Sequence, residues 1–245
     1  MILKPFFPYF GSKHRLSKRY KEPSKDLLIE PFAGSACYSL HYSHKQVRLY
    51  DKYDVICGIW DYLINASERE ILDLPLIDFD KTLGDYTVCQ EARWLIGYFL
   101  ADARGIPSIK HTSRSINKIR ENENAKNRWT DSKKNQIASQ LQYIRHWTIE
   151  KKSYEQIENE DCTWFIDPPY QQAGKNYKES AKNIDFEHLG IWCKSRIGEV
   201  IVCENYGASW LPFENFASLR NIQNKETFEV VYYQGFQDDQ LILGL

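Results

Sequence analysis

The sequence predicts an α/β fold with a mostly parallel, doubly wound sheet. Short apolar runs with strand character alternate with longer stretches that are apolar at helical spacing, and this alternation is typical of βαβ units. Three of the apolar runs end in an acid, namely Glu30, Asp51 and Asp167. Because the ligands of such sheets bind beyond the carboxyl ends of the strands, we expect these acids to meet in one site.

The expected elements follow one another along the chain. We expect strands at 26–30, 46–50, 163–166 and 199–203, and helices at 38–44, 55–65, 91–103, 133–146 and 186–196. Asp131 or Ser132 can cap the helix that starts at Lys133. Residues 105–129 are polar and basic, which indicates a loop or a small insert. Residues 227–233 and 240–243 have the pattern of an antiparallel pair.

Length and composition limit the class of protein. A chain of 245 residues suits one large α/β domain, or a core domain with a modest insert. Hydrophobic residues make up 42% of it and charged residues 27%, as in ordinary globular proteins. No apolar run is long enough to cross a bilayer, and the first residues lack the pattern of a signal peptide. The six cysteines form no CxxC pair, so we expect reduced core thiols, no zinc and a cytoplasmic location.

Basic residues are distributed unevenly, although the net charge is only −1. Residues 104–152 contain twelve Lys or Arg against four acids, a net charge of +8, which leaves −9 for the rest of the chain. The first 25 residues are also basic, with seven Lys or Arg and one acid. A one-sided basic surface is typical of proteins with a polyanionic partner. A solvated helix face is the alternative that charge alone leaves open.

The first two strand ends have features of a nucleotide site. After Glu30 the sequence PFAGSA supplies small residues, which let the backbone approach a ligand closely, although the spacing is not G-x-G-x-x-G. Asp51 follows 21 residues after Glu30, at the end of the next expected strand. An acid at about this distance can accept the hydroxyl hydrogens of a ribose. Alternatively Asp51 caps the following helix, a role that Asp54 could take instead.

The third strand end is Asp167-Pro168-Pro169-Tyr170, which follows the apolar run TWFI. Proline fixes φ and removes a backbone donor, and the residue before a proline is held extended. Asp167 and Pro168 both precede a proline, so helix hydrogen bonds do not consume their carbonyls. The corner therefore presents a carboxylate, a carbonyl and an aromatic ring together.

These groups suit an exocyclic amine on a flat ring. The two N–H bonds of such an amine can point at the Asp167 carboxylate and the Pro168 carbonyl while Tyr170 stacks on the ring. Holding both hydrogens directs the nitrogen lone pair outward, toward an electrophile. Because a conjugated amine is a poor nucleophile, orientation and charge stabilisation must supply most of the rate.

At these residues the sequence resembles the Dam-type DNA adenine-N6 methyltransferases. PYFGSKHRL at 8–16 resembles the opening motif of that family, EPFAGSA its S-adenosylmethionine loop, Asp51 its ribose acid and DPPY its catalytic tetrapeptide. The four elements occur in the order that the family has. The basic stretch falls where the family places its target-recognition region.

The resemblance implies a Rossmann-like S-adenosylmethionine-dependent methyltransferase fold with a small inserted target-recognition region. It divides the chain into a cofactor-binding half at 1–103, a basic insert at 104–150 and a catalytic half at 151–245. It also implies that adenine flips out of double-stranded DNA, because its amine is out of reach while stacked and paired. The N6 amine then attacks the sulfonium methyl directly, without a metal or a nucleophilic cysteine. We expect a monomer or a weak dimer.

The site residues that the resemblance implies fall into three groups. The catalytic residues are Asp167, Pro168, Pro169 and Tyr170. The cofactor-binding residues are Tyr9, Gly11, Lys13, Glu30, Pro31, Phe32, Ala33, Gly34, Ser35, Ala36, Asp51, Tyr154 and Asp167. The candidates for contact with DNA are Arg114, Ser115, Asn117, Lys118, Arg120, Arg128, Lys133 and Lys134, most of them toward phosphate.

Two positions depart from the family pattern. Ala36 stands where the family commonly has the last glycine of its loop, and Ser153 stands where an acid often precedes an aromatic residue. Trp129 could be a stacking wedge, but we expect it to anchor the following helix in the core. Glu204, at the end of a strand, either borders the flipped base or belongs to an ordinary loop.

Two other functions stay open at this stage. The same geometry would serve DNA cytosine-N4 methylation, which also acts on an exocyclic amine. A non-catalytic DNA-binding protein could retain a degenerate methylase fold, although the intact DPPY and Asp51 favour catalysis. A compact solitary methylase of this kind fits a phage, a mobile element or a restriction-modification system.

Overall fold

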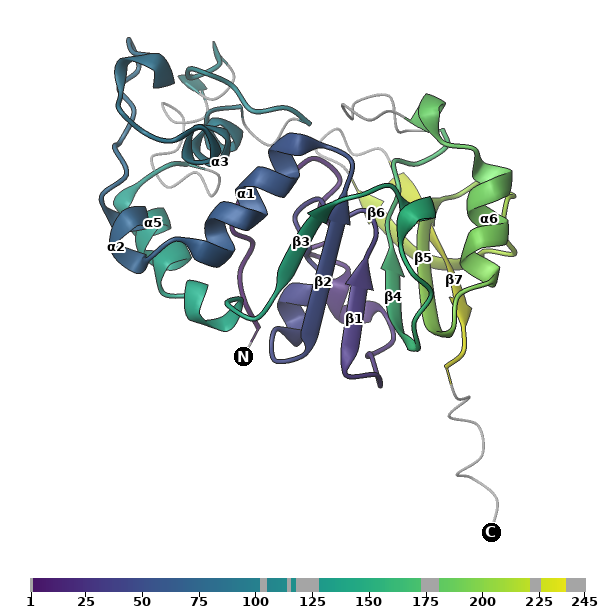
Figure 1. Ribbon diagram of the computed structural model, residues 1–245. Coiled ribbons are helices and arrows are strands. Elements are labelled where there is room, and N and C mark those ends of the chain that lie inside the picture. Colours follow the sequence, from purple (N-terminus) through teal and green to yellow (C-terminus); the bar gives the residue numbers. More distant parts are fainter. Residues whose placement is uncertain are drawn as a thin grey trace.

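A twisted sheet runs through the middle of the molecule. The computed structural model describes residues 2–101, 105–113, 116–117, 128–172, 181–220 and 226–236, and within them seven strands pair in the order β3-β2-β1-β4-β5-β7-β6 (Figure 1). The strands are β1 (Leu27–Glu30), β2 (Gln46–Asp51), β3 (Thr148–Lys151), β4 (Cys162–Ile166), β5 (Gly198–Asn205), β6 (Glu214–Arg220) and β7 (Glu226–Gln234). The first five run parallel to one another, whereas β7 is antiparallel to both β5 and β6.

The strand order places β1 and β4 at the centre. From β1 the chain moves outward to β2 and β3, and it then returns to begin again at β4 on the other side of β1. This reversal is the topological switch point at which doubly wound sheets bind their ligands. The sheet is therefore compatible with a Rossmann-like fold, with a crevice beyond Glu30 and Ile166.

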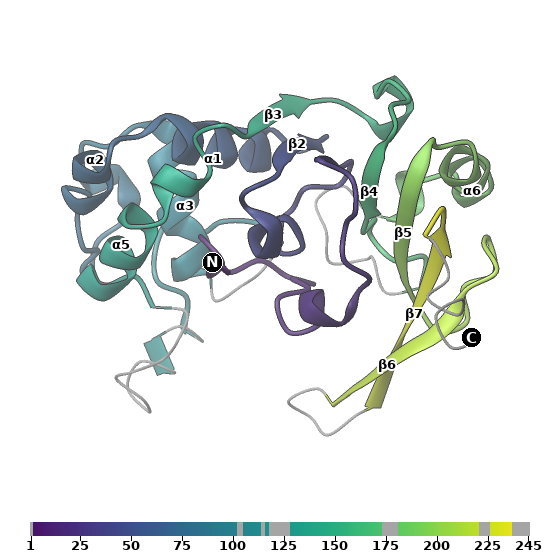
Figure 2. The same cartoon turned by 90° about the horizontal axis from the view of Figure 1, so that it is seen from below.

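Helices lie on both sides of the sheet. The helices α1 (Asp54–Asn65), α2 (Glu68–Leu72), α3 (Gln90–Leu100) and α5 (Asp131–Ala138) gather near β3, and α6 (Phe186–Lys194) lies beside β5 (Figures 1 and 2). Short 3-10 turns occur at Ser17–Arg19, Ser39–Tyr42, Leu83–Asp85, Leu141–Tyr143, Tyr154–Gln156 and Ala181–Asn183.

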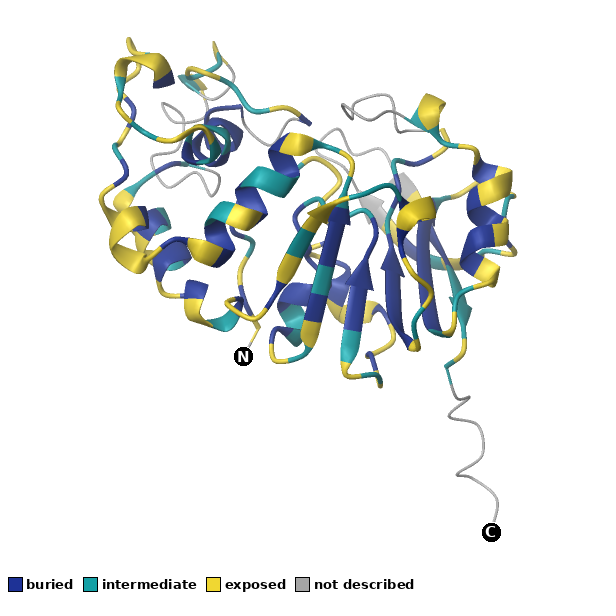
Figure 3. Ribbon diagram, in the orientation of Figure 1, coloured by how far each residue is buried: buried dark blue, intermediate teal, exposed yellow. Residues whose placement is uncertain are grey.

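Alternating side chains of the central strands fill two hydrophobic cores. On one face Phe165 and Ile201 pack with α1, α3 and the N-terminal segment, and on the other face Trp164 and Val202 pack with α6. Figure 3 shows β4 and β5 buried along most of their length, with exposed residues on the outer side of α6. Because both faces are covered, these strands have continuous apolar sequences.

The structure confirms most of the expected elements. Five expected strand segments correspond to β1, β2, β4, β5 and β7, and three expected helices correspond to α1, α3 and α6. Two strands were missed, the edge strands β3 and β6. Residues 240–243, expected to pair with β7, lie outside the described residues; β7 pairs with β5 and β6.

Two expected helices are shorter than the sequence predicts. Residues 39–42 form a 3-10 turn because the Ser39 backbone and hydroxyl both donate to Glu30. The helix expected at 133–146 starts after Thr130, which is its N-cap in place of Asp131 or Ser132, and ends at Ala138. There the backbone tightens to 3-10 hydrogen bonding, which lets the Gln140 amide pair with both backbone groups of Lys4.

The described residues include no helix long and apolar enough to cross a bilayer. They also include no group of three His, Cys, Asp or Glu side chains that could hold a metal ion. All six cysteines are free thiols, and four are buried, as expected of core thiols: Cys37, Cys162, Cys193 and Cys203.

Candidate active site

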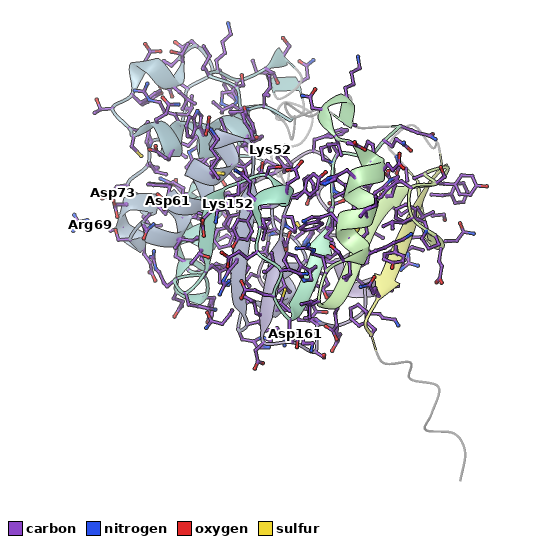
Figure 4. The ribbon with its side chains drawn as sticks, turned by 45° about the vertical axis from the view of Figure 1, so that its right-hand side comes forward. Lys52, Asp61, Arg69, Asp73, Lys152 and Asp161 are labelled. Carbon is purple, nitrogen blue, oxygen red and sulfur yellow. The ribbon has the colours of Figure 1, made fainter. Side chains whose placement is uncertain are left out.

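A pocket lies beyond the carboxyl ends of β1, β2 and β4. Its empty space is about 950 Å³, open solvent included. The wall brings together every residue expected to bind the cofactor, from Tyr9 to Asp167, and also Pro169. The sequence did not predict the further wall residues Phe10, Ser12, Cys37, Lys52, Tyr53, Phe165, Asn183 and Ile184. Figure 4 shows Lys52 and Asp161 toward opposite ends of the sheet.

Backbone forms the wall at the turn after β1. The Gly34 amide donates to Asp51 Oδ2 at 3.1 Å, and the Trp60 indole donates to the Gly34 carbonyl at 2.9 Å. Gly34 has a φ of +44°, and a Cβ there would lie 3.1 Å from the Tyr9 ring. This position therefore requires glycine, both for its left-handed backbone and for its close approach to Tyr9.

Asp51 connects this turn to helix α1. Its Oδ2 accepts from Gly34, and its Oδ1 accepts from the Tyr53 amide at 2.9 Å. Tyr53 is the N-cap of α1, and Asp54 is the first helical residue and pairs with Lys151, so neither acid is the N-cap. Because each carboxylate oxygen has two lone pairs, Asp51 can accept further hydrogens from a ligand without releasing the loop.

Glu30, at the end of β1, is 2% exposed. It accepts hydrogen bonds from the Ser39 amide at 2.9 Å and from the Ser39 hydroxyl at 2.5 Å. Burial raises the pKa of Glu30 to about 8, against the opposing effect of the two Ser39 bonds. At neutral pH the carboxyl is therefore mostly protonated, and it can ionise when a cation enters the pocket.

Asp167 faces the pocket from the end of β4 and meets Lys13. The Lys13 Nζ lies 2.9 Å from Asp167 Oδ1, so the two side chains form an ion pair. The Lys13 side chain is 5% exposed and that of Asp167 is 21% exposed. Burial raises the pKa of Asp167, and the Lys13 charge opposes the rise, which favours the carboxylate.

Tyr170 is held on two sides. Its hydroxyl donates to Glu229 Oε2 at 2.6 Å, and the Lys13 Nζ lies 4.5 Å from its ring centroid. The residue is only 9% exposed, so it is not the open stacking plate that the sequence suggested. Glu229 was not predicted, although an acid within the apolar run TFEVVYY is a signal for a buried polar contact.

Glu204 fixes the backbone that follows the DPPY corner. It is fully buried and accepts hydrogen bonds from the Gln171 amide at 3.2 Å, the Trp210 indole at 3.1 Å and the Asn205 amide at 2.8 Å. Glu204 therefore ties two loops together, instead of bordering a base.

Aromatic rings form the wall opposite Asp167. Phe32 and Tyr154 lie with ring centroids 5.8 Å apart, tilted by 33°. The Tyr154 hydroxyl contacts His188 Nδ1 at 2.8 Å, and its ring lies edge-on to Trp192. These contacts hold Tyr154, which is 3% exposed, while Phe32 beside it is half-buried and the more open of the two rings.

Few of the candidates for contact with DNA are open to solvent in the described residues. Lys134 is buried and directs its ammonium to the carbonyls of Leu72 and Leu74 and to Asp131, which uses all three donors. This corrects the prediction that Lys134 contacts DNA. Lys133 is half-buried and donates to Gln136 at 2.6 Å.

The other candidates give a mixed picture. Asn117 is exposed and Arg128 is half-buried, and the remaining four lie outside the described residues: Arg114, Ser115, Lys118 and Arg120. Trp129 is the core anchor that we expected, because it is 6% exposed, donates to the Pro75 carbonyl and packs on Phe99.

No family model matches the chain, and no curated protein does so. Function must therefore be inferred from the residues of the pocket.

Ala36 has a φ of 46°, in the region that favours glycine, and is 1% exposed. In Ala36→Gly, the lost burial of a methyl, about 0.8 kcal/mol, is offset by relief of strain of about 1–2 kcal/mol. We expect the free energy of unfolding, measured with urea, to change by less than about 1 kcal/mol. The control Ala33→Gly, equally buried but without a left-handed φ, should lose more stability; equal losses would contradict the strain.

Glu30 should make the protein less stable as pH rises. The folded state holds its proton up to a pKa of about 8, whereas the unfolded state releases it near 4.5, so stability is lost between these values. In Glu30→Gln this loss should disappear, and the variant should be the more stable protein at pH 8. Urea unfolding at pH 5, 6.5 and 8 measures both proteins, and parallel pH profiles would refute the raised pKa.

Proposed function

We propose that this protein is an S-adenosylmethionine-dependent DNA methyltransferase of the Dam type, which acts on the N6 amine of a flipped adenine. One observation carries the proposal. The acid of the DPPY corner, the acid at the end of β2 and the backbone of the turn after β1 all line the same pocket. The pocket lies at the switch point of a doubly wound sheet, where such a ligand is expected.

The pocket suits each part of S-adenosylmethionine. Asp51 can accept the ribose hydroxyls, Phe32 and Tyr154 offer flat surfaces for the adenine, and the turn at Gly34 leaves backbone groups for the amino-acid end. Asp167 and Glu30 both line the pocket, and Glu30 would gain negative charge by ionising when the cationic cofactor binds. When bound, this cofactor supplies an electrophilic methyl group.

The corner at Asp167 can hold the amine of the target base. Among the described residues no hydrogen bond reaches the Pro168 carbonyl, so this oxygen is available as an acceptor beside the Asp167 carboxylate. Together they take both amine hydrogens, which directs the lone pair away from the protein corner and toward the pocket. Lys13 supports this step because its charge opposes the rise that burial causes in the pKa of Asp167 and so favours the carboxylate.

Asp167 also accounts for the charge of the reaction. As the bond from nitrogen to methyl forms and the bond from methyl to sulfur breaks, the amine becomes positive, and the carboxylate stabilises it. Because burial raises the pKa of Asp167, the carboxylate can accept the released proton and pass it to water at its exposed side.

Methyl transfer from labelled S-adenosylmethionine to DNA, followed by nucleoside analysis, tests the proposal. N6-methyladenine supports it, and N4-methylcytosine would instead support the related reaction on cytosine. Absence of any methylated base would leave a DNA-binding protein with a methylase-like fold.

Asp167→Ala should lower methyl transfer by at least about 100-fold, because it removes both the amine acceptor and the charge stabilisation. Cofactor binding, measured by calorimetry, should weaken far less than methyl transfer, although the variant leaves the buried Lys13 charge without its partner. The matched control is Asp161→Ala, at the other end of β4, where the side chain is 60% exposed and pairs with Lys25. Unchanged turnover in Asp167→Ala would refute the role of Asp167.

Asp51→Ala should raise the dissociation constant for S-adenosylmethionine by about 10- to 100-fold, since it removes a charged acceptor. Asp54→Ala is the control. Asp54 lies three residues after Asp51, on the first turn of α1, and its carboxylate pairs with Lys151 outside the pocket. Equal affinity in both variants would show that Asp51 only supports the loop.

A further inference from the structure

The described cations of the expected DNA-binding stretch mostly bond within the protein. Lys134 is buried as described above, Arg145 donates to the carbonyls of Ile64 and Ala66, and Lys152 pairs with Glu150. These side chains stabilise the helices and the β3 edge.

A second basic surface lies in the N-terminal segment, directly after Lys13. The run 13–21, KHRLSKRYK, contains no acid, and four of its cations are exposed: Arg15, Lys18, Arg19 and Lys21. The run winds as a turn and a 3-10 helix, with the amides of Leu16 and Ser17 both donating to the Lys13 carbonyl at 2.8 Å. Its first residue is the lysine that pairs with Asp167.

Buried side chains fix this run to the sheet. Tyr20 stacks on Phe216 of β6 with ring centroids 4.4 Å apart and lies edge-on to Phe165 of β4. Arg19 donates to the Phe216 carbonyl at 3.0 Å and lies over its ring. The run thus presents its cations from a rigid support.

The charges of the run are close enough to act on one another. The pKa of His14 is lowered by burial and by the charges of Lys18 and Arg15, and that of His41, on the neighbouring 3-10 turn, is lowered by burial and by His14 and Lys18. Among the described residues no acid pairs with Arg15 or Lys18. Such a cluster is stabilised by a polyanion.

We propose that the run 13–21 binds the phosphate backbone of DNA next to the flipped base. This inference rests on the proposed function. The exposed Arg15 and Lys18 lie three residues apart along the run, and neighbouring phosphates follow one another along one DNA strand. The run can therefore place separate cations against separate phosphates of one strand. The run begins at Lys13, whose Nζ lies 2.9 Å from Asp167 in the pocket. This position favours DNA over an anionic membrane, because only DNA would also place a base in the pocket.

The test is the salt dependence of DNA binding in R15Q/K18Q. Fluorescence anisotropy of a labelled, mixed-sequence 30-base-pair duplex gives the binding constant at several salt concentrations. If both cations contact phosphate, the slope of log K against log salt should fall in magnitude by roughly 1.8, at about 0.9 per contact. Calorimetry should show unchanged binding of S-adenosylmethionine.

The control is R69Q/K81Q, which removes two charges from cations that pair with Asp73 and Asp78. Arg69 lies on α2, at the side of the molecule beyond the sheet edge β3 (Figure 4). The slope of log K against log salt for R69Q/K81Q should match that of the wild type. A slope in R15Q/K18Q equal to that of the control would overturn the proposal, as would failure of the wild type to bind the duplex.

Methyl transfer by the wild type to the same duplex separates this inference from the proposed function. Transfer with an unchanged slope in R15Q/K18Q would reject the phosphate surface and keep the methyltransferase. A reduced slope without transfer would keep the surface as a DNA contact and reject the reaction.

Discussion

The ion pair between Lys13 and Asp167 is the contact on which most of the site depends. It joins the N-terminal segment to the end of the central strand β4, and both side chains are largely withdrawn from water. A charge at such depth is costly without its partner. The pair therefore fixes the segment that carries Tyr9 against Gly34, and it places the lysine over Tyr170. The corner of β4, the cofactor turn and the N-terminal segment are thus coupled.

The sheet positions the reactive groups, and two buried acids on neighbouring strands orient them. Glu229 on β7 holds the Tyr170 hydroxyl, and Glu204 on β5 holds the amide of Gln171. The last residue of the DPPY corner and the residue that follows it are thus both held by hydrogen bonds. Burial raises the pKa of both acids. Because little water reaches these carboxyl groups, protein donors must supply their hydrogen bonds.

The sequence predicted the elements whose burial is visible in their residues. β4 and β5 are continuous apolar runs because both of their faces are covered. The acids that follow the strands were expected to meet because parallel strands end at the same edge of a sheet. The edge strand β3 was missed because TIEK is mostly exposed and has no apolar pattern. Its pairing with β2 is a tertiary contact that no local pattern indicates.

The polar contacts were harder to predict than the pocket wall. Lys134 has the sequence context of a surface lysine, and only the fold brings the carbonyls of Leu72 and Leu74 to it. Tyr170 likewise gains its partner from β7, far along the chain. Motif spacing thus predicted which residues meet, whereas their orientation depends on partners that are distant in sequence.

The reversed strand β7 lies between β5 and β6, although it follows both of them along the chain. During synthesis on a ribosome, β5 and β6 emerge before the strand that joins them, and Tyr170 has no acceptor until residue 229 has left the exit tunnel. A nascent chain can therefore form the turn after β1 early, but it completes the contacts of the DPPY corner only once β7 has emerged.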